Sequence, residues 1–181
     1  MNSNNRRMDF IGRWLILALS AIAFAAFFPA MSFAQPAENV KQAMASLKAK
    51  TAKLGAPAIK GEDTVAGKSV PALYFGTTKM NNNFAVVDEV KKEKGGTATL
   101  FVKSGEDFVR VATNVLKDDG SRAIGTMLDP KGKAIAAIRG DKPYYGEADI
   151  LGKPYITGYE PIRDSGGNVI GIYYVGYPKA Q

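Results

Sequence analysis

The C-terminal third of the chain, residues 144–178, constrains the fold most strongly, because it is a nearly continuous series of strand-forming segments. Aromatic and hydroxyl side chains recur there at every second position, so that Tyr155, Thr157 and Tyr159 fall on one face of a strand. A glycine-rich turn at 164–168 then leads to a second run of β-branched and aromatic residues. The pattern predicts an antiparallel hairpin with polar aromatic side chains on one face.

The remaining segments alternate between helix-like and strand-like patterns. Residues 58–69 are polar and contain two glycines, which predicts a loop. The predicted elements are a helix over 37–54, a short edge strand over 70–75, a helix over 84–92, strands over 97–103 and 107–114, a helix over 128–139 opened by Asp129-Pro130, and strands from 144 onward. This order predicts an α+β domain in which the N-terminal helix and further helices pack on a central, largely antiparallel sheet.

Residues 1–34 have the parts of a secretory signal peptide. Arg6, Arg7 and Arg13 form a basic segment before an apolar run over 14–28, and residues 32–34 form a small-x-small cleavage sequence. We therefore expect cleavage after Ala34, which leaves a single domain over 35–181 that is periplasmic or secreted. The alternative is an uncleaved membrane anchor, because the apolar run approaches the length that spans a bilayer.

The sequence contains no cysteine and no histidine. A fold without disulfides depends on its core, and the commonest general base, metal ligand and thiol nucleophile are missing. No nucleophile elbow, phosphate-binding loop or dinucleotide-binding motif occurs either. We therefore expect a protein that is not an enzyme and that has no metal and no cofactor.

The chain is basic, with a net charge of +7 that becomes +5 when the leader's three arginines and one aspartate are removed. Such an excess favours anionic partners. Export argues against nucleic acid as the partner, and the lysines are scattered, with Lys41, Lys48, Lys50 and Lys53 on the solvated face of the first helix. What remains is a bias toward small anionic ligands.

Four short blocks in the second half of the chain resemble a known family. They are residues 113–114, 119–126, 151–155 and 167–176. In this order, over about residues 39–178, they resemble a single-Cache sensor domain of the Cache-3/Cache-2 fusion type, found outside the membrane in bacterial chemoreceptors and sensor kinases. The resemblance implies a PAS-like fold that binds a ligand on the concave face of its sheet, under the loops and the helix that precede the last strands.

The resemblance and the polar aromatic face together point to a site for a small carboxylate or amino acid. Guanidinium groups grip carboxylates in a bidentate manner, and tyrosine hydroxyls add donors on a rigid stem. The predicted ligand-binding residues are Arg122, Arg139, Tyr145, Lys153, Tyr155, Thr157 and Tyr159. A wider set of candidates adds Arg110, Asn114 and Tyr144. Each has a structural alternative, such as stabilising a helix end, solvation in a turn or filling the core.

Two functional hypotheses follow. The first is an exported sensory protein that binds a small metabolite, an organic acid or another anion, and passes the signal to a partner such as a membrane receptor or kinase. The second is an interaction module that has kept the fold and lost the ligand site, with a homodimer formed through the N-terminal helix. A copurified small molecule would favour the first hypothesis.

Overall fold

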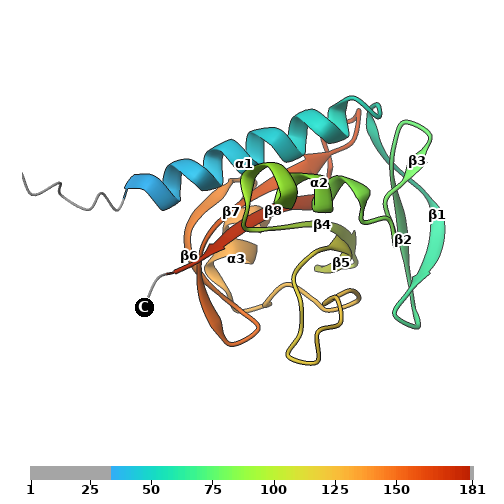
Figure 1. Cartoon of the computed structure of the whole chain (residues 1–181). Helices are drawn as coiled ribbons and strands as arrows, with labels where there is room; N and C mark the ends of the chain where they lie inside the picture. Colours follow the sequence, from blue (N-terminus) through green and yellow to red (C-terminus); the bar gives the residue numbers. More distant parts are fainter. Residues whose placement is uncertain (1–33, 180–181) are drawn as a thin grey trace, which may run out of the picture. The chain divides into compact units, whose positions relative to one another are not determined.

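The computed structural model describes residues 34–179 and folds them into three helices and two antiparallel sheets (Figure 1). A small sheet has the order β1-β2-β3, and a five-stranded sheet has the order β5-β4-β8-β7-β6. The helices are α1 (Ala34–Ala52), α2 (Ala85–Lys94) and α3 (Lys133–Arg139); the strands are β1 (Pro57–Val65), β2 (Lys68–Phe75), β3 (Thr78–Lys79), β4 (Thr97–Ser104), β5 (Asp107–Thr113), β6 (Tyr144–Ile150), β7 (Lys153–Arg163) and β8 (Val169–Pro178). The predicted α+β class with helices on a central antiparallel sheet is confirmed.

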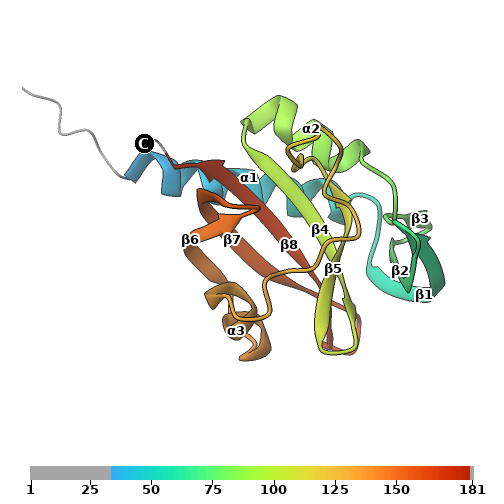
Figure 2. The ribbon, with the colours of Figure 1, turned by 90° about the horizontal axis from the view of Figure 1, so that it is seen from below.

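Two hydrophobic cores lie on opposite faces of the five-stranded sheet. The first contains Val40 and Leu47 of α1 and is shared with α2 and the small sheet. The second contains Ile135 and Ile138 of α3 together with Tyr174 of β8. Figure 2 shows this arrangement from below, with α3 in front of the sheet and α1 behind it. Alternate residues of β4, such as Leu100 and Phe101, therefore pack in opposite cores.

The predicted hairpin in the C-terminal third is confirmed as β7 and β8, which pair from Tyr155↔Pro178 to Arg163↔Val169. Its predicted alternation also holds, because Tyr155 and Tyr159 pack in the core on the α3 side. The intervening Ile156 packs in the core on the α1 side. The face of the hairpin that carries Tyr155 and Tyr159 is therefore the face on which α3 lies.

The prediction of a loop over 58–69 is wrong, because β1 and the start of β2 occupy it. β1 lies at the edge of the small sheet and is mostly exposed, so its sequence lacks the alternation of a half-buried strand. The prediction that 70–75 is an edge strand is also wrong, since β2 lies between β1 and β3. Pro71 is tolerated there because β3 pairs only with Tyr74 and Phe75, beyond the proline.

The helix predicted over 128–139 is shorter than expected, because α3 begins at Lys133. Asp129 closes a turn instead, since its carboxylate accepts a hydrogen bond from the Lys131 amide and its carbonyl accepts one from the Gly132 amide. Pro130 therefore lies in this turn and not at the first helical position. An aspartate whose side chain bonds the backbone two residues on favours a turn as readily as a helix start.

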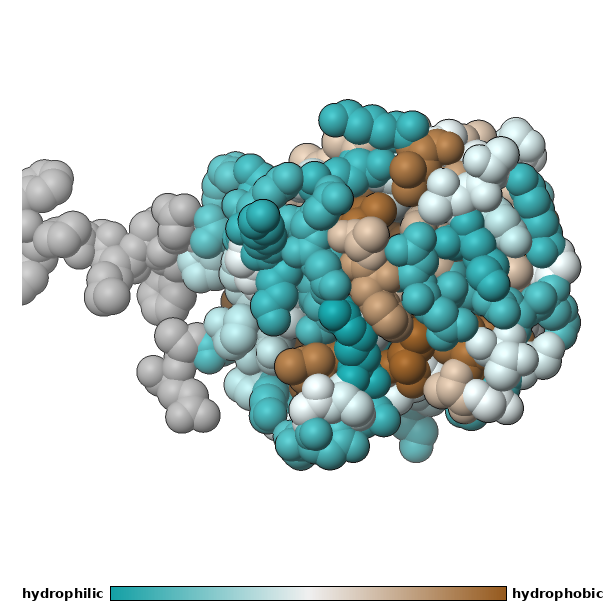
Figure 3. Space-filling view, turned by 45° about the vertical axis from the view of Figure 1, so that its right-hand side comes forward, coloured by the Kyte–Doolittle hydropathy of each residue, from teal (hydrophilic) through white to brown (hydrophobic). Residues whose placement is uncertain are grey.

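The surface and termini add two observations. Figure 3 shows one face of the molecule, on which apolar side chains gather in a central band between hydrophilic residues. Within residues 34–179, no helix has the length and apolar character needed to cross a membrane. The predicted signal peptide falls, apart from Ala34, on residues outside the described part of the chain.

Candidate functional site

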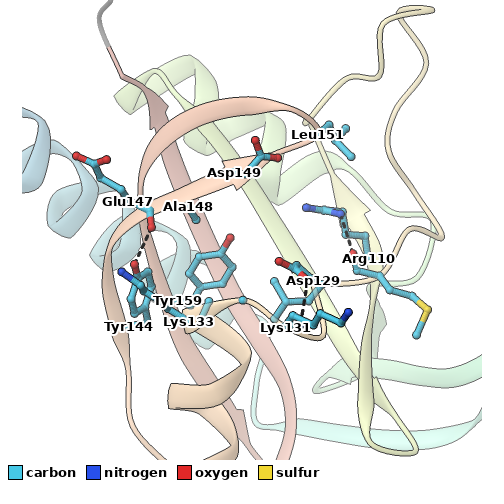
Figure 4. A pocket seen from close by; sticks show the side chains of 14 residues that line it. Arg110, Asp129, Lys131, Lys133, Tyr144, Glu147, Ala148, Asp149, Leu151 and Tyr159 are labelled. Atoms are coloured by element: carbon cyan, nitrogen blue, oxygen red, sulfur yellow. Dashed lines mark hydrogen bonds between the residues drawn. The ribbon is translucent and has the colours of Figure 1, made fainter.

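A cavity of about 500 Å³ opens on the α3 face of the five-stranded sheet (Figure 4). One wall is Arg110 of β5, and another is the segment 127–134, which leads into α3. The opposite side is formed by residues of β6 and of the β6–β7 turn, and Tyr159 of β7 also lines the cavity. A cavity of this volume has the size of a small-molecule site.

Arg110 is the most unusual residue of this cavity, because it carries a charge and is only 4% exposed. One guanidinium nitrogen, Nη1, donates to the hydroxyl of Thr126 at 2.6 Å and to the carbonyl of Met127 at 3.4 Å. The Nε atom is buried without a hydrogen-bond partner, and no ion pair within residues 34–179 includes Arg110. Burial accordingly lowers the pKa of Arg110, while the nearby Tyr159 and Tyr174 act in the opposite direction.

The loop after β5 holds Arg110 in this position. The Arg110 amide donates to the Thr126 carbonyl, and the Gly125 amide donates back to the Arg110 carbonyl, each at 2.9 Å. The Thr126 hydroxyl donates to the Ala123 carbonyl at 2.7 Å, which leaves its oxygen lone pairs to accept from the guanidinium. The ring of Phe101 lies 5.0 Å from the guanidinium carbon on the other side. Arg110 is thus fixed by its neighbours without being neutralised.

Tyr159 lies across the cavity from this loop and is only 1% exposed. Its ring packs against Tyr174 at 5.0 Å and Tyr144 at 6.2 Å between centroids. Its hydroxyl makes no hydrogen bond within residues 34–179, and Figure 4 shows it directed into the cavity. Burial raises the pKa of Tyr159, the charge of Arg110 lowers it, and Tyr144 and Asp129 raise it. Arg110 and Asp129 therefore both act electrostatically on the Tyr159 hydroxyl.

Asp129 is the acidic group that Figure 4 shows beside Arg110 and Tyr159. One of its oxygens accepts from the Lys131 amide at 2.9 Å, and no cation of the described residues forms an ion pair with it. Residues 34–179 contain no cluster of three acidic, histidine or cysteine residues that could hold a metal ion. The cavity thus brings the buried Arg110 cation, the Tyr159 hydroxyl and the exposed Asp129 carboxylate together. Its lining also includes Lys131, Lys133, Tyr144, Glu147 and Asp149.

Of the seven residues predicted to bind a ligand, the structure places Tyr159 in this cavity. Thr157 lies on the same strand but is fully buried and donates to the Gly146 carbonyl at 2.7 Å. Tyr155 and Lys153 line a separate cavity of about 240 Å³, where Lys153 pairs with Asp118 at 3.1 Å.

The other three predicted residues lie in three different places. Arg122 forms a bidentate ion pair with Asp88, with both contacts at 2.8 Å. Arg139 lines a third cavity of about 360 Å³ and donates to the Glu106 carbonyl at 3.0 Å. Tyr145 lies on the opposite side of the sheet, where its hydroxyl donates to Glu160, the partner of Lys48 of α1. As ligand contacts these residues remain predictions.

The wider set of candidates contains two residues of the large cavity, Arg110 and Tyr144. Asn114 is not among its lining residues, and its amide is satisfied by the Ala98 amide and the Val87 carbonyl. The sequence does carry a signal for Arg110, because a single charge interrupts the apolar strand Phe108–Ala112. Asp129 was missed as a site residue, since its position before a proline is typical of a helix start.

Comparison with known proteins agrees with this architecture. No curated protein matches the chain. The family model of the Cache 3/Cache 2 fusion domain matches residues 34–181, which include all the helices and strands described above. Cache domains are extracytoplasmic sensory modules that bind small molecules and are typically not enzymes, and their PAS-like α+β fold is the one found here. The chain belongs to the Cache 3/Cache 2 fusion domain family.

Proposed function

We propose that this protein is an exported sensory module that binds a small carboxylate ligand in the cavity beside Arg110. The observation that carries this proposal is the buried guanidinium, which has one unsatisfied nitrogen and no carboxylate partner in the described part of the chain. Burying a cation without a counterion is costly, and a bound anion removes that cost. A carboxylate also fits the planar donors of arginine better than it fits a lysine.

Tyr159 supports the same assignment. Its free hydroxyl faces the cavity in which Arg110 lies, so a carboxylate held by the guanidinium can accept a hydrogen bond from it. Its ring is fixed by Tyr144 and Tyr174, which reduces the entropy lost on binding. In this proposal the ligand-bound state is passed to a partner protein, such as a membrane receptor or kinase.

The carboxylates that line the cavity, of which Figure 4 shows Asp129 beside Arg110, distinguish the two ligand classes that the sequence suggests, plain carboxylates and amino acids. An ammonium group on the ligand would pair with Asp129 while the carboxylate pairs with Arg110. A plain carboxylate would leave Asp129 with only its backbone contact. Pairs of compounds that differ only in the amine, such as propionate and L-alanine, or 4-methylpentanoate and L-leucine, therefore separate the classes.

The test is a thermal-shift and calorimetric comparison of these pairs on the wild type and on Arg110→Met. A ligand that binds only the folded state raises the melting temperature. We expect a rise in the wild type that is lost in Arg110→Met and retained in the control Arg163→Met, since Arg163 lies at the far end of β7 and pairs with Asp141. A rise that persists in Arg110→Met would overturn the assignment. A folded, metabolite-free wild type that responds to nothing would favour the interaction module, including a homodimer.

A further inference from the structure

The cavity and α1 lie on opposite faces of β6 and β7, and two pairs of neighbouring residues connect them. Tyr144 and Tyr145 are adjacent on β6, and Tyr159 and Glu160 are adjacent on β7. Tyr144 pairs directly with Tyr159 across the two strands. The first member of each pair lines the cavity, whereas the second faces α1. One short stretch of strand backbone thus separates the candidate ligand site from the helix.

Three polar side chains join β6, β7 and α1 on this back face. Glu160 accepts a hydrogen bond from the Lys48 ammonium at 2.5 Å and another from the Tyr145 hydroxyl at 2.5 Å. The Glu160 side chain is only 22% exposed, so water screens the pair less than it screens an open surface ion pair. We call these residues the Lys48–Glu160–Tyr145 triad.

The helix also packs directly on the backbone of β7 beside the triad. A Cβ atom added at Gly158 would lie 2.8 Å from a methyl carbon of Val40 and 2.8 Å from the Tyr145 ring. Val40 itself is 1% exposed. No flexible side chain therefore separates α1 from this strand, and a close-packed contact of this kind transmits displacement instead of absorbing it.

We propose that the Lys48–Glu160–Tyr145 triad and Gly158 couple the cavity to α1. The triad positions Tyr159 for the ligand, and a ligand that engages Tyr159 changes the packing of α1. The proposal rests on the function proposed above, because it requires a ligand in that cavity. Coupling between two sites is reciprocal, so disturbing the triad must also change the affinity of the cavity.

The first test measures amide hydrogen exchange of α1 and of β5 with and without propionate and L-alanine. If propionate or L-alanine slows amide hydrogen exchange in β5, which carries Arg110, we expect it to change amide exchange in α1 as well. In Glu160→Gln the α1 response is lost and the affinity falls by about fivefold, at the lower end of typical allosteric coupling. An α1 response that is unchanged in Glu160→Gln, or absent from the wild type while β5 is protected, would overturn the proposal.

Matched variants separate coupling from loss of structure. Lys48→Arg keeps the cation and should keep the response, whereas Lys48→Met should lose it. Lys41→Met is the control, since Lys41 is an exposed lysine of the same helix for which no ion pair is found within residues 34–179. Equal responses in Lys48→Met and Lys41→Met would contradict a role for the triad.

A second arm needs no ligand. Ala148 lines the cavity from β6, so Ala148→Phe, or the milder Ala148→Met, fills part of it covalently. We expect altered α1 exchange in this variant, and normal α1 exchange when Glu160→Gln is added. If neither propionate nor L-alanine protects β5, the proposal that the cavity binds such ligands is contradicted. The filled variants still test whether the cavity is coupled to α1. Unaltered α1 exchange in both filled variants would contradict the coupling.

Discussion

Gly125 lies so close to Ala66 that a Cβ atom added to the glycine would come within 2.5 Å of the Ala66 Cβ. The contact joins the β1–β2 turn to the loop after β5, two segments that are distant in sequence. The next residue of that loop, Thr126, holds the Arg110 guanidinium. The β1–β2 turn of the small sheet thus supports the loop that holds Arg110 in the cavity.

Replacing Gly125 with alanine should therefore lower both stability and ligand affinity. Gly125 has a φ of +75°, so alanine adds backbone strain of about 1 kcal/mol in addition to the clash with Ala66. Gly120→Ala is the matched control, because Gly120 has a φ of +80° in the same loop but nothing within 4 Å of its added Cβ. Urea unfolding should show the larger loss for Gly125→Ala; equal losses would mean that the contact with Ala66 is unimportant.

Thr126 should affect binding through Arg110. Thr126→Val keeps the shape of the side chain but removes the acceptor for the guanidinium, whereas Thr126→Ser retains it. A hydrogen bond to a charged group contributes about 1.5–3 kcal/mol, so we expect the valine variant to bind the best ligand of the panel roughly tenfold or more weakly. Calorimetry on both variants provides the measurement. Wild-type affinity in Thr126→Val would show that Arg110 needs no such support.

Two neighbouring tyrosines should separate binding from stability. The Tyr159 hydroxyl has no partner within residues 34–179, whereas the Tyr174 hydroxyl shares a hydrogen bond with Thr97 at 3.0 Å. Tyr159→Phe should thus weaken binding by about threefold to tenfold with little change in melting temperature. Tyr174→Phe should cost about 1 kcal/mol of unfolding free energy and leave affinity unchanged. The opposite pattern would place the ligand elsewhere.

The strand pattern of the C-terminal third could be predicted from the sequence, because alternating residues in β7 and β8 report directly on the two faces that they bury. β1 could not be predicted, since an exposed edge strand has no buried face to impose alternation. The same limit applies to Asp129, whose turn and helix-start roles give the same local sequence.

The candidate site was harder to predict than the fold, because it depends on which charges find partners. The sequence favours Arg122 as a residue that binds a carboxylate and places Arg110 only in the wider set of candidates. In the structure Asp88 pairs with Arg122, while no acid among residues 34–179 pairs with Arg110. Asp88 lies 34 positions before Arg122, and only the packing of α2 beside β5 brings the two together. Which arginine forms an ion pair therefore depends on the tertiary structure and cannot be read from the spacing of charges in the sequence.

Glu160 should make part of the stability depend on pH. Burial raises the pKa of this carboxyl, but hydrogen bonds from Lys48 and Tyr145 and the charge of Lys48 outweigh it, so its pKa lies below the ordinary value of 4.5. A carboxyl whose pKa is lower in the folded than in the unfolded protein stabilises the fold above its unfolded pKa, and this stabilisation is lost as the pH falls through the folded value. Urea unfolding of wild type and Glu160→Gln should therefore differ by a constant amount above about pH 5, and the difference should shrink below 4.5. A difference that stays constant down to the acid limit of folding would show that the charge on Glu160 does not stabilise its contact with Lys48.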